Sequence, residues 1–363
     1  MTRELLNLDG FDSSSGADAR DSFPPVRGED WETRIQAFKD NSGNVHFEDG
    51  TKDDGVRVAD ICRSAKLGSG SFGQVWKATV KGHTLAFCNP IIKDFKPEQK
   101  WAKHTAKAME IDSARGPRCA NILPCYGYII GENVRVMAPY PTTAVLEYSV
   151  ILFLQFMTTS LGKILERSGT IPDLVVGKFA SDVSAGMYHL RHTFKVLHRD
   201  IKPDNMLIDK RTGVVKLCDF GLAGKVNDLS QITSAPTTAK YLAPEIGTRS
   251  VDGKKSEWTT QTDVYSFGIS MYELIKGVLP VDNRPIYLKE PLNLHLTPND
   301  SPNLHTLVND CLLPDKDAEK LRPNIKNLDH HPVIRRFRVE EINVVTWLSK
   351  TLTEHPELDS DGL

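Results

Sequence analysis

One eight-residue stretch constrains this chain more than any other part of its sequence. Residues 198–205 read His-Arg-Asp-Ile-Lys-Pro-Asp-Asn, and Asp-Phe-Gly follows at 219–221. The stretch holds a carboxylate that can accept a proton (Asp200), a cation (Lys202) and an amide that can bind a metal (Asn205). Transfer of a phosphoryl group requires such a set, because a base orients the hydroxyl, cations spread the phosphate charge and oxygen donors hold Mg²⁺.

The two segments resemble the catalytic loop and the metal-binding motif of eukaryotic protein kinases, His-Arg-Asp-x-Lys-x-x-Asn followed by Asp-Phe-Gly. The resemblance implies that Asp200 accepts or orients the proton of the substrate hydroxyl. It implies that Lys202 neutralises the moving γ-phosphoryl group of ATP. Asn205 and Asp219 would hold Mg²⁺, which prefers hard oxygen ligands.

A glycine-rich segment at 68–75 reads Gly-Ser-Gly-Ser-Phe-Gly-Gln-Val. Glycines allow the backbone to approach phosphates closely. The same pattern also opens dinucleotide-binding turns, where its third glycine begins a helix, but here residues 74–80 read as a strand. We therefore interpret it as the phosphate-covering loop of a kinase, with Val75 and Ala86 over the adenine. The expected contacts to ATP in this region are Leu67, Gly68, Ser69, Gly70, Ser71, Phe72, Gly73, Val75 and Ala86.

The lysine that kinases use to bind the α- and β-phosphates is difficult to place. The family pattern Val-Ala-Ile-Lys aligns most simply with residues 85–88, which puts Cys88 at the lysine position. The spacing from Gly73 favours Cys88, whereas the spacing back from Glu110 favours Lys93. Kinases that lack this lysine supply one from the glycine loop, but this chain keeps Gly73 at that place. We favour Lys93, because the remaining machinery is complete.

The other expected nucleotide contacts come from a helix, the hinge and the pocket floor. Glu110, on a helix expected at 97–114, would pair with the phosphate-binding lysine. Asp112 is a weaker alternative, because it would lie on another face of that helix. We expect adenine to contact the hinge and the floor of its pocket at Gln155, Met157 and Leu207.

The segment at 243–245 reads Ala-Pro-Glu, which shapes a peptide platform in the family and argues against a small-molecule kinase. The resemblance also implies an ion pair between Glu245 and Arg322, and it implies that Asp263 anchors the catalytic loop. Lys202 and Thr238 are typical of serine/threonine kinases. An upstream kinase would act on the activation segment, where the candidate hydroxyls are Ser230, Thr233, Ser234 and Thr237.

Composition excludes several other classes of protein. The net charge of −2 gives no basic field, so we expect neither nucleic acid nor an anionic membrane as a partner. The apolar runs are too short to span a bilayer, and we expect no membrane insertion. The six cysteines are scattered without a Cys-x-x-Cys pair, which favours free thiols in a reducing compartment. We expect a cytoplasmic protein, with the nucleus as the alternative, whose partners are protein substrates.

Strand-like patterns precede helical ones along the chain, which predicts an α+β, two-lobed protein kinase fold. Its small antiparallel β lobe with one helix would span about 56–154, and its larger α-helical lobe about 158–338, within a kinase domain at 56–338. Residues 1–55 are acidic and polar, so we expect a largely disordered extension. A final helix and tail are expected at 339–363.

Together these patterns predict a serine/threonine protein kinase that uses ATP and Mg²⁺. The alternative is a pseudokinase, a scaffold that binds nucleotide but transfers phosphate poorly because Cys88 replaces the usual lysine.

Overall fold

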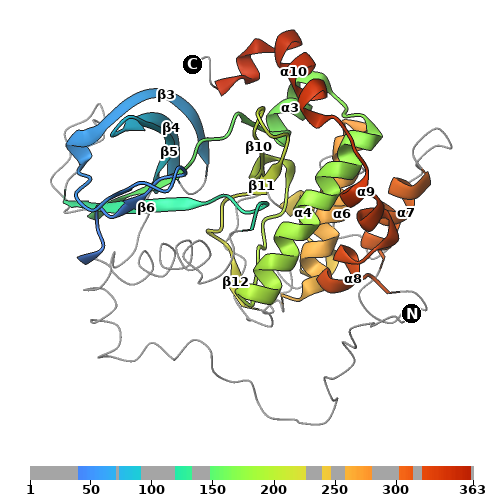
Figure 1. Ribbon diagram of the computed structural model, residues 1–363. Helices are drawn as coiled ribbons and strands as arrows, with labels where there is room; N and C mark the ends of the chain where they lie inside the picture. Colours follow the sequence, from blue (N-terminus) through green and yellow to red (C-terminus); the bar gives the residue numbers. More distant parts are fainter. Residues whose placement is uncertain are drawn as a thin grey trace, which may run out of the picture. The chain divides into compact units, whose positions relative to one another are not determined.

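The structure is a computed structural model. The chain forms two compact units, residues 1–41 and residues 42–363. The elements named below belong to the second unit (Figure 1). The structure describes residues 40–70, 73–90, 119–132, 148–225, 239–246, 258–279, 302–313 and 321–360.

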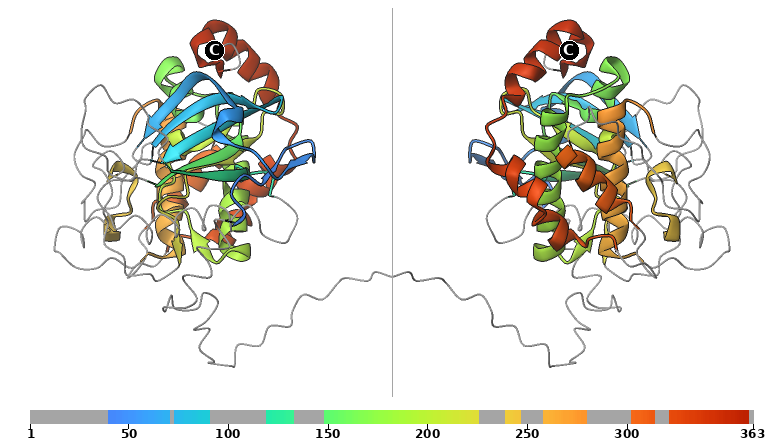
Figure 2. Two further views of the ribbon diagram at one scale, coloured as in Figure 1. Left: turned by 90° about the vertical axis from the view of Figure 1, so that its left-hand side faces the viewer. Right: turned by 90° about the vertical axis from the view of Figure 1, so that its right-hand side faces the viewer.

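The first lobe is built on a seven-stranded antiparallel sheet with the strand order β2-β1-β6-β7-β5-β4-β3. The left view of Figure 2 shows this sheet in blue to green. Apolar side chains alternate along these strands and fill one face, where Phe153, Leu85 and Val80 are almost fully buried. The strands are β1 (Val45–His46), β2 (Lys52–Asp53), β3 (Ile61–Gly70), β4 (Gly73–Val80), β5 (His83–Pro90), β6 (Cys125–Glu132) and β7 (Tyr148–Gln155).

A two-residue turn joins β4 to β5. Its central residues, Lys81 and Gly82, have φ angles of 50° and 86°. Turns with positive φ at both central positions match the right-handed twist of the flanking strands, so they set the register of a hairpin. The register pairs Val75 with Cys88 and Lys77 with Ala86. This pairing places Ala86 and Cys88 on one face of the sheet.

Strands β1 and β2 extend the sheet beyond the start of the predicted kinase domain. Val45 pairs with Gly127 of β6, and Val45 and Phe47 are buried in the same core as Phe153. A side chain at Gly127 would meet the carbonyl oxygen of Asn44, so glycine permits this close approach. We expected residues 1–55 to be largely disordered, but their described part, 40–55, contributes two strands to the sheet.

The second lobe is mainly helical. Its central helix, α4, buries Val176, Phe179, Val183 and Met187, whose spacing puts them on one apolar stripe. The helices of this lobe are α3 (Leu161–Ser168), α4 (Asp173–Thr193), α6 (Thr260–Lys276), α7 (Pro302–Cys311), α8 (Ile325–Asp329), α9 (Pro332–Val339) and α10 (Val344–Glu354). Short strands lie between α3 and α6, at β9 (Val196–Leu197), β10 (Met206–Ile208), β11 (Val215–Leu217) and β12 (Gly224–Lys225).

Local sequence explains where several of these helices begin and end. The Ser160 side chain, in the short strand β8 (Thr159–Ser160), accepts a hydrogen bond from Lys163 N and caps α3. Asn343 caps α10 in the same way, through Thr346 N. Gly277 adopts a left-handed conformation at the end of α6, where glycine avoids the cost of a Cβ.

The last helix belongs to the core of the second lobe. Leu348 and Leu352 of α10 are buried in the same cluster as Phe179 of α4. The rings of Trp347 and Phe179 lie 5.8 Å apart, edge to face. Residues 344–354 are therefore packed as part of this lobe. Among the residues described, no helix combines the length and the apolar character needed to cross a membrane.

The predicted helix of the first lobe, at 97–114, lies outside the described residues. So do the candidate phosphorylation sites of the activation segment, Ser230, Thr233, Ser234 and Thr237, together with Thr238.

Candidate active site

The loop at 198–205 is held in place by a buried carboxylate of α6. Asp263 Oδ2 accepts a hydrogen bond from His198 N at 2.8 Å, and Asp263 Oδ1 accepts one from Arg199 N at 2.9 Å. Arg199 has a φ of 66°, a strained conformation for an arginine. The predicted anchoring of this loop by Asp263 is confirmed.

Asp200, Lys202 and Asn205 converge as the motif predicts. The Asp200 side chain is buried, and its Oδ2 lies 2.9 Å from Lys202 Nζ. Asn205 Nδ2 donates to the carbonyl oxygen of Asp200 at 2.8 Å and to its Oδ2 at 2.9 Å. Hydrogen bonds from charged or amide donors fix the direction of a carboxylate, so the Asp200 oxygens are oriented before any substrate binds.

Asp219 lies close enough to Asp200 for the two charges to interact. Burial, and after it the negative charge of Asp200, raises the pKa of Asp219 to about 6. Asp219 has a φ of 62°, and its Oδ1 accepts a hydrogen bond from Gly221 N at 3.4 Å. A half-buried carboxylate beside a second one is destabilised when charged, unless a cation neutralises it.

The residues present fit a Mg²⁺ ion. Asp219 and Asn205 offer hard oxygen donors, and the negative charge of Asp200 acts on Asp219, so this pair of carboxylates favours a nearby cation. Within the described part of the chain, no group of three or more His, Cys, Asp and Glu side chains could hold a metal by itself. Mg²⁺ commonly uses one or two carboxylates and takes its remaining ligands from water and substrate phosphates.

His198 joins the loop to the segment that carries Asp219. Its Nε2 lies 2.9 Å from the carbonyl oxygen of Cys218, and its ring centroid is 5.3 Å from that of Phe220. Cys218 N donates to the carbonyl oxygen of Asn205 at 3.0 Å. Burial lowers the pKa of His198 to about 4, so the ring is neutral and acts as a structural link.

Cys88 occupies the place that the sequence alignment gave to a lysine. Burial raises the pKa of its thiol to about 12, and the charge of Asp219 contributes to the increase. The thiol is therefore neutral and lies near the carboxylate expected to bind metal. Lys93 and Glu110, our candidates for the phosphate-binding lysine and its partner, lie outside the described residues, so that pairing stays a prediction.

Most of the predicted nucleotide-covering residues that the structure describes lie on β3 and β4, and Ala86 lies on β5. Leu67 and Gly68 belong to β3, and Gly70 pairs with Gly73 at the start of β4. The Leu67 carbonyl oxygen accepts a hydrogen bond from Lys163 Nζ of α3 at 2.8 Å, a contact that the sequence did not indicate. Ser69 pairs with Gln74, while Ser71 and Phe72 lie outside the described residues.

The predicted hinge begins at Gln155, the last residue of β7. Gln155 N donates to the carbonyl oxygen of Pro124 at 3.1 Å, so an adenine contact at Gln155 would use its carbonyl oxygen. Its side-chain amide donates to Glu48 Oε1 at 2.9 Å. Met157 is buried, and Leu207 is half-buried on β10, beside Ser160.

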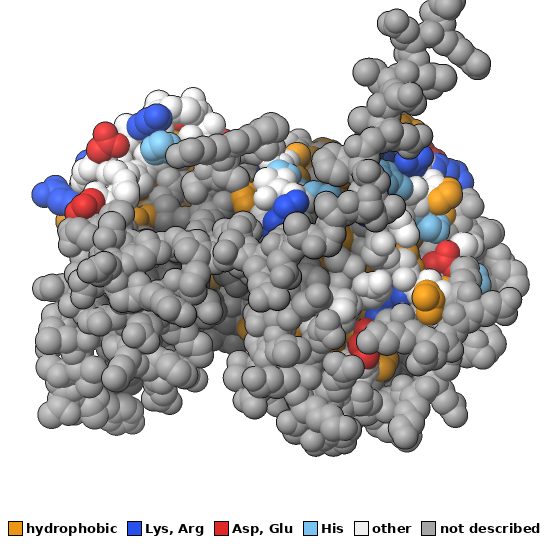
Figure 3. All heavy atoms as spheres, turned by 90° about the horizontal axis from the view of Figure 1, so that it is seen from below, with side chains coloured by type: hydrophobic (Ala, Val, Ile, Leu, Met, Phe, Trp, Pro, Cys, Tyr) orange, Lys and Arg blue, Asp and Glu red, His pale blue; other side chains and the backbone are white. Residues whose placement is uncertain are grey.

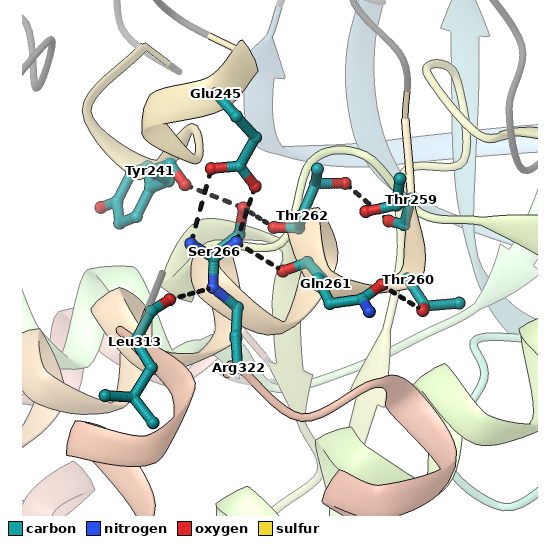
Figure 4. A network of polar contacts seen from close by, with 9 residues as sticks. All are labelled: Tyr241, Glu245, Thr259, Thr260, Gln261, Thr262, Ser266, Leu313 and Arg322. Carbon is teal, nitrogen blue, oxygen red and sulfur yellow. Dashed lines mark hydrogen bonds and ion pairs between the residues drawn. The ribbon is translucent and has the colours of Figure 1, made fainter. Parts of the chain in front are cut away.

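A second polar network supports the segment at 239–246 (Figure 4). Arg322 Nη1 lies 2.7 Å from Glu245 Oε1, which confirms the predicted ion pair. The same guanidinium donates to the carbonyl oxygens of Leu313 and Gln261, at 2.8 and 3.0 Å. Arg322 therefore joins the segment to α6 and to the end of α7.

Comparison with known proteins agrees with this geometry. Residues 62–334 match the family model described as protein kinase domain. The human protein named dual specificity mitogen-activated protein kinase kinase 7 is 30% identical over 315 residues, which cover 83% of this chain and 69% of that protein. The Caenorhabditis elegans dual specificity mitogen-activated protein kinase kinase mek-1 is 27% identical over 296 residues, covering 79% of this chain and 77% of that protein. Protein kinase wis1 of Schizosaccharomyces pombe is 26% identical over 337 residues, covering 87% of this chain and 50% of that protein.

Proposed function

Because the chain belongs to the protein kinase family, we propose that it is an active kinase that transfers the γ-phosphoryl group of ATP to serine and threonine hydroxyls of proteins. The observation that carries the proposal is the convergence of Asp200, Lys202 and Asn205 through hydrogen bonds of 2.8 to 3.2 Å. ATP and Mg²⁺ are the cofactors of this family, and the ion would supply positive charge beside the phosphates from its place on Asn205 and Asp219.

In the proposed reaction, the Asp200 carboxylate accepts the hydrogen bond of the incoming hydroxyl and takes its proton as the new oxygen–phosphorus bond forms. The bond between the γ-phosphorus and the oxygen that bridges it to the β-phosphate breaks in the same transfer, and ADP leaves. Lys202 Nζ, held 2.9 Å from Asp200 Oδ2, is placed to offset the negative charge of the moving phosphoryl group. Asp263 keeps the loop in position through its two backbone hydrogen bonds. Positioning and charge stabilisation account for most of the catalysis in phosphoryl transfer.

Dual specificity is the first alternative, and it is favoured by the names of the relatives. The human and nematode proteins are both named dual specificity mitogen-activated protein kinase kinases. If this chain shares that property, it phosphorylates tyrosine as well, and its substrate is another kinase. Lys202 is typical of kinases that phosphorylate serine and threonine, and it is compatible with dual specificity as well.

A pseudokinase is the second alternative, and it is favoured by Cys88. The neutral thiol beside Asp219 cannot replace a fixed cation. In the active-kinase proposal Lys93 supplies that cation; in the pseudokinase alternative the site holds nucleotide and acts as a scaffold.

One set of variants tests these alternatives. Phosphate transfer from ATP to a generic protein substrate is measured with the wild type, Asp200→Asn and Lys93→Met, and the phosphorylated amino acids are identified. We expect Asp200→Asn to lower kcat by about 10²- to 10⁴-fold, because a positioned base contributes that much. Lys93→Met should lower kcat by about 10²-fold, the effect of removing one electrostatic donor.

Glu354→Gln, an exposed change on α10, serves as the control and should leave the rate unchanged. Wild-type protein that binds ATP but transfers no phosphate would support the scaffold alternative. Activity that survives Lys93→Met would contradict the lysine assignment alone, and phosphotyrosine in the product would establish dual specificity.

A further inference from the structure

Residues 356–360, which we call the strap segment, lie outside the part of the chain that matches the kinase family model. We propose that the strap segment ties the nucleotide-covering hairpin of β3 and β4 to the hinge and to the second lobe, and that Lys77 and Ser360 are positioning residues for nucleotide binding. The nucleotide in this inference is the ATP of the proposed function, so the inference rests on that function.

The strap segment is fastened to the second lobe. It follows α10 as a short 3-10 helix, η4 (Pro356–Leu358). Leu358 is buried in the core of this lobe, and both carboxylate oxygens of Asp359 lie within 3.0 Å of Lys210 Nζ. Lys210 is fixed in turn, because its backbone N donates to Thr158 Oγ1 at 3.0 Å. An apolar anchor and an ion pair therefore hold the segment close to the hinge.

Ser360 connects the hinge to the first lobe. Its backbone N donates to the carbonyl oxygen of Thr158 at 3.3 Å, and Thr158 directly follows the hinge residue Met157. The carbonyl oxygen of Ser360 accepts a hydrogen bond from Lys77 Nζ at 3.0 Å. Lys77 Nζ also lies 5.2 Å from the ring centroid of Phe156. Ser360 is only 6% exposed, so this junction is largely shielded from water.

Lys77 faces the predicted nucleotide site. It stands directly opposite Ala86, and Val75 stands opposite Cys88. Directly paired residues of antiparallel strands share a face, as do residues two apart along one strand. Lys77 thus lies on the face of Val75 and Ala86, the residues that we expect to cover adenine.

Each strand of the hairpin has a hydrogen bond to another part of the chain. On β3, the Leu67 carbonyl oxygen accepts the hydrogen bond from Lys163 Nζ of α3. On β4, Lys77 reaches the strap segment. The first tie comes from an exposed lysine, whereas the second meets a carbonyl oxygen of a residue buried at the hinge. The strap segment is therefore the firmer of the two attachments.

This arrangement has a consequence for affinity. Movement of the lobes about the hinge would displace the hairpin from the second lobe, and the ammonium–carbonyl contact of Lys77 with Ser360 opposes that displacement. A charged donor makes a stronger hydrogen bond than a neutral one. When only a fraction of the molecules has the binding-competent arrangement, the apparent affinity falls by that fraction. Loss of the strap should weaken nucleotide binding and leave the chemical step largely intact.

A double-mutant cycle in the full chain tests the inference. The dissociation constant for ATP with Mg²⁺, and KM and kcat, are measured for the wild type, Lys77→Met, Asp359→Asn and the double variant. We expect each single variant to raise the dissociation constant and KM by about 3- to 10-fold, with kcat changed less than about twofold. The double variant should bind ATP no more weakly than the single variant with the lower affinity, because both changes release the same strap segment.

Two further variants control the cycle. Lys77→Arg retains a charged donor and should restore most of the affinity, whereas Lys350→Met, at an exposed position of α10, should have no effect. Additive effects, or a loss with Lys77→Met and none with Asp359→Asn, would overturn the inference, because Lys77 would then contact the nucleotide directly.

Amide hydrogen exchange without nucleotide separates this inference from the proposed function. Exchange across residues 61–80 should be faster in Lys77→Met and in Asp359→Asn than in the wild type. Unchanged exchange would contradict the proposed role of the strap segment, whether or not the protein binds nucleotide. Faster exchange in a protein whose wild type binds no ATP would leave the strap in place and reject the kinase function.

Discussion

At the scale of single residues, buried carboxylates hold the catalytic loop and its surroundings together. Asp263 accepts two backbone hydrogen bonds from the loop, and Asp182 of α4 accepts one from Val215 N at 3.0 Å. Burial raises the pKa of Asp182 to about 6, and it does the same for Asp263. These acids therefore position the backbone at a cost, because a carboxylate removed from water is destabilised when charged.

The cost at Asp182 should appear in the pH dependence of stability. Its pKa is about 6 in the folded protein, against 3.8 for an aspartate in water, so the folded state binds the proton more tightly than the unfolded state. Stability should then fall as pH rises from about 4 to about 6, and the penalty should be complete above pH 6. Asp182→Asn keeps an oxygen acceptor for Val215 N and removes the charge. We expect it to raise the free energy of unfolding by about 1 to 2 kcal/mol at pH 8.

Denaturant unfolding of Asp182→Asn and the wild type, from pH 4 to pH 8, measures this difference. The two proteins should have similar stability at pH 4 and diverge as pH increases. Asp54→Asn, an exposed substitution, should show no such divergence. A difference independent of pH would contradict the assignment of the penalty to the Asp182 charge.

At the scale of elements, contacts from segments far away along the chain support residues 239–246, the segment that we expect to shape a peptide platform. The segment at 239–246 holds a short 3-10 helix, η3 (Ala239–Tyr241), and a helical turn at 244–246, and its position depends on neighbouring helices. Arg322 reaches it through Glu245, and Tyr241 Oη donates to Glu273 Oε2 of α6 at 2.7 Å. Ser266 Oγ also donates to the Tyr241 carbonyl oxygen, as Figure 4 shows.

Removal of the Arg322 side chain should lower the free energy of unfolding. Arg322→Met leaves Glu245 without its cation and leaves the carbonyl oxygens of Leu313 and Gln261 without their donor. Loss of one partner of a buried ion pair costs about 3 to 5 kcal/mol, and partial exposure of Glu245 places this pair near the lower limit, at about 3 kcal/mol. Thermal or denaturant unfolding measures the loss.

The matched control is Arg336→Met on α9. Arg336 Nε lies 3.0 Å from Glu340 Oε2, but both side chains are substantially exposed. Surface pairs contribute at most about 1 kcal/mol, so we expect little change in stability. Equal losses from Arg322→Met and Arg336→Met would show that burial does not strengthen the Arg322 network.

At the scale of the whole molecule, the apolar side chains of the described residues form two separate cores. One lies under the seven-stranded sheet, and the other fills the helical lobe and includes α10. On the face in Figure 3, acidic and basic side chains of the described residues lie near one another, in keeping with the net charge of −2. Folding of the helical lobe should depend on α10, although this helix lies outside the residues that match the family model.

Leu348→Ala tests this dependence. Leu348 of α10 is fully buried, and truncation of a buried leucine to alanine costs about 2 to 5 kcal/mol through lost transfer energy and a residual cavity. We expect a loss in that range for the unfolding transition of the helical lobe, followed by circular dichroism. Lys350→Ala, exposed on the same helix, is the control. A loss below about 0.5 kcal/mol with Leu348→Ala would mean that α10 packs too loosely to stabilise the lobe.

The sequence alone predicted the convergence of Asp200, Lys202 and Asn205, the anchoring Asp263, and the ion pair of Glu245 with Arg322. Motif spacing carries this information, because it depends on residues close together along the chain or on a pattern shared by a family. The phosphate-binding cation is not determined by the sequence. Alignment puts Cys88 at the lysine position, and only the fold brings this thiol near Asp219.

Tertiary structure alone decided which flanking segments reach the hinge. Lys77 and Ser360 are separated by 283 residues, and no local pattern in either segment indicates their hydrogen bond. The strands at 45–53 likewise read as loop, because Asp and Gly surround them, and they become ordered by pairing with β6. Such contacts form where two packed surfaces meet. The positions of these surfaces are determined by the burial of the two apolar cores rather than by the residues that form the contact.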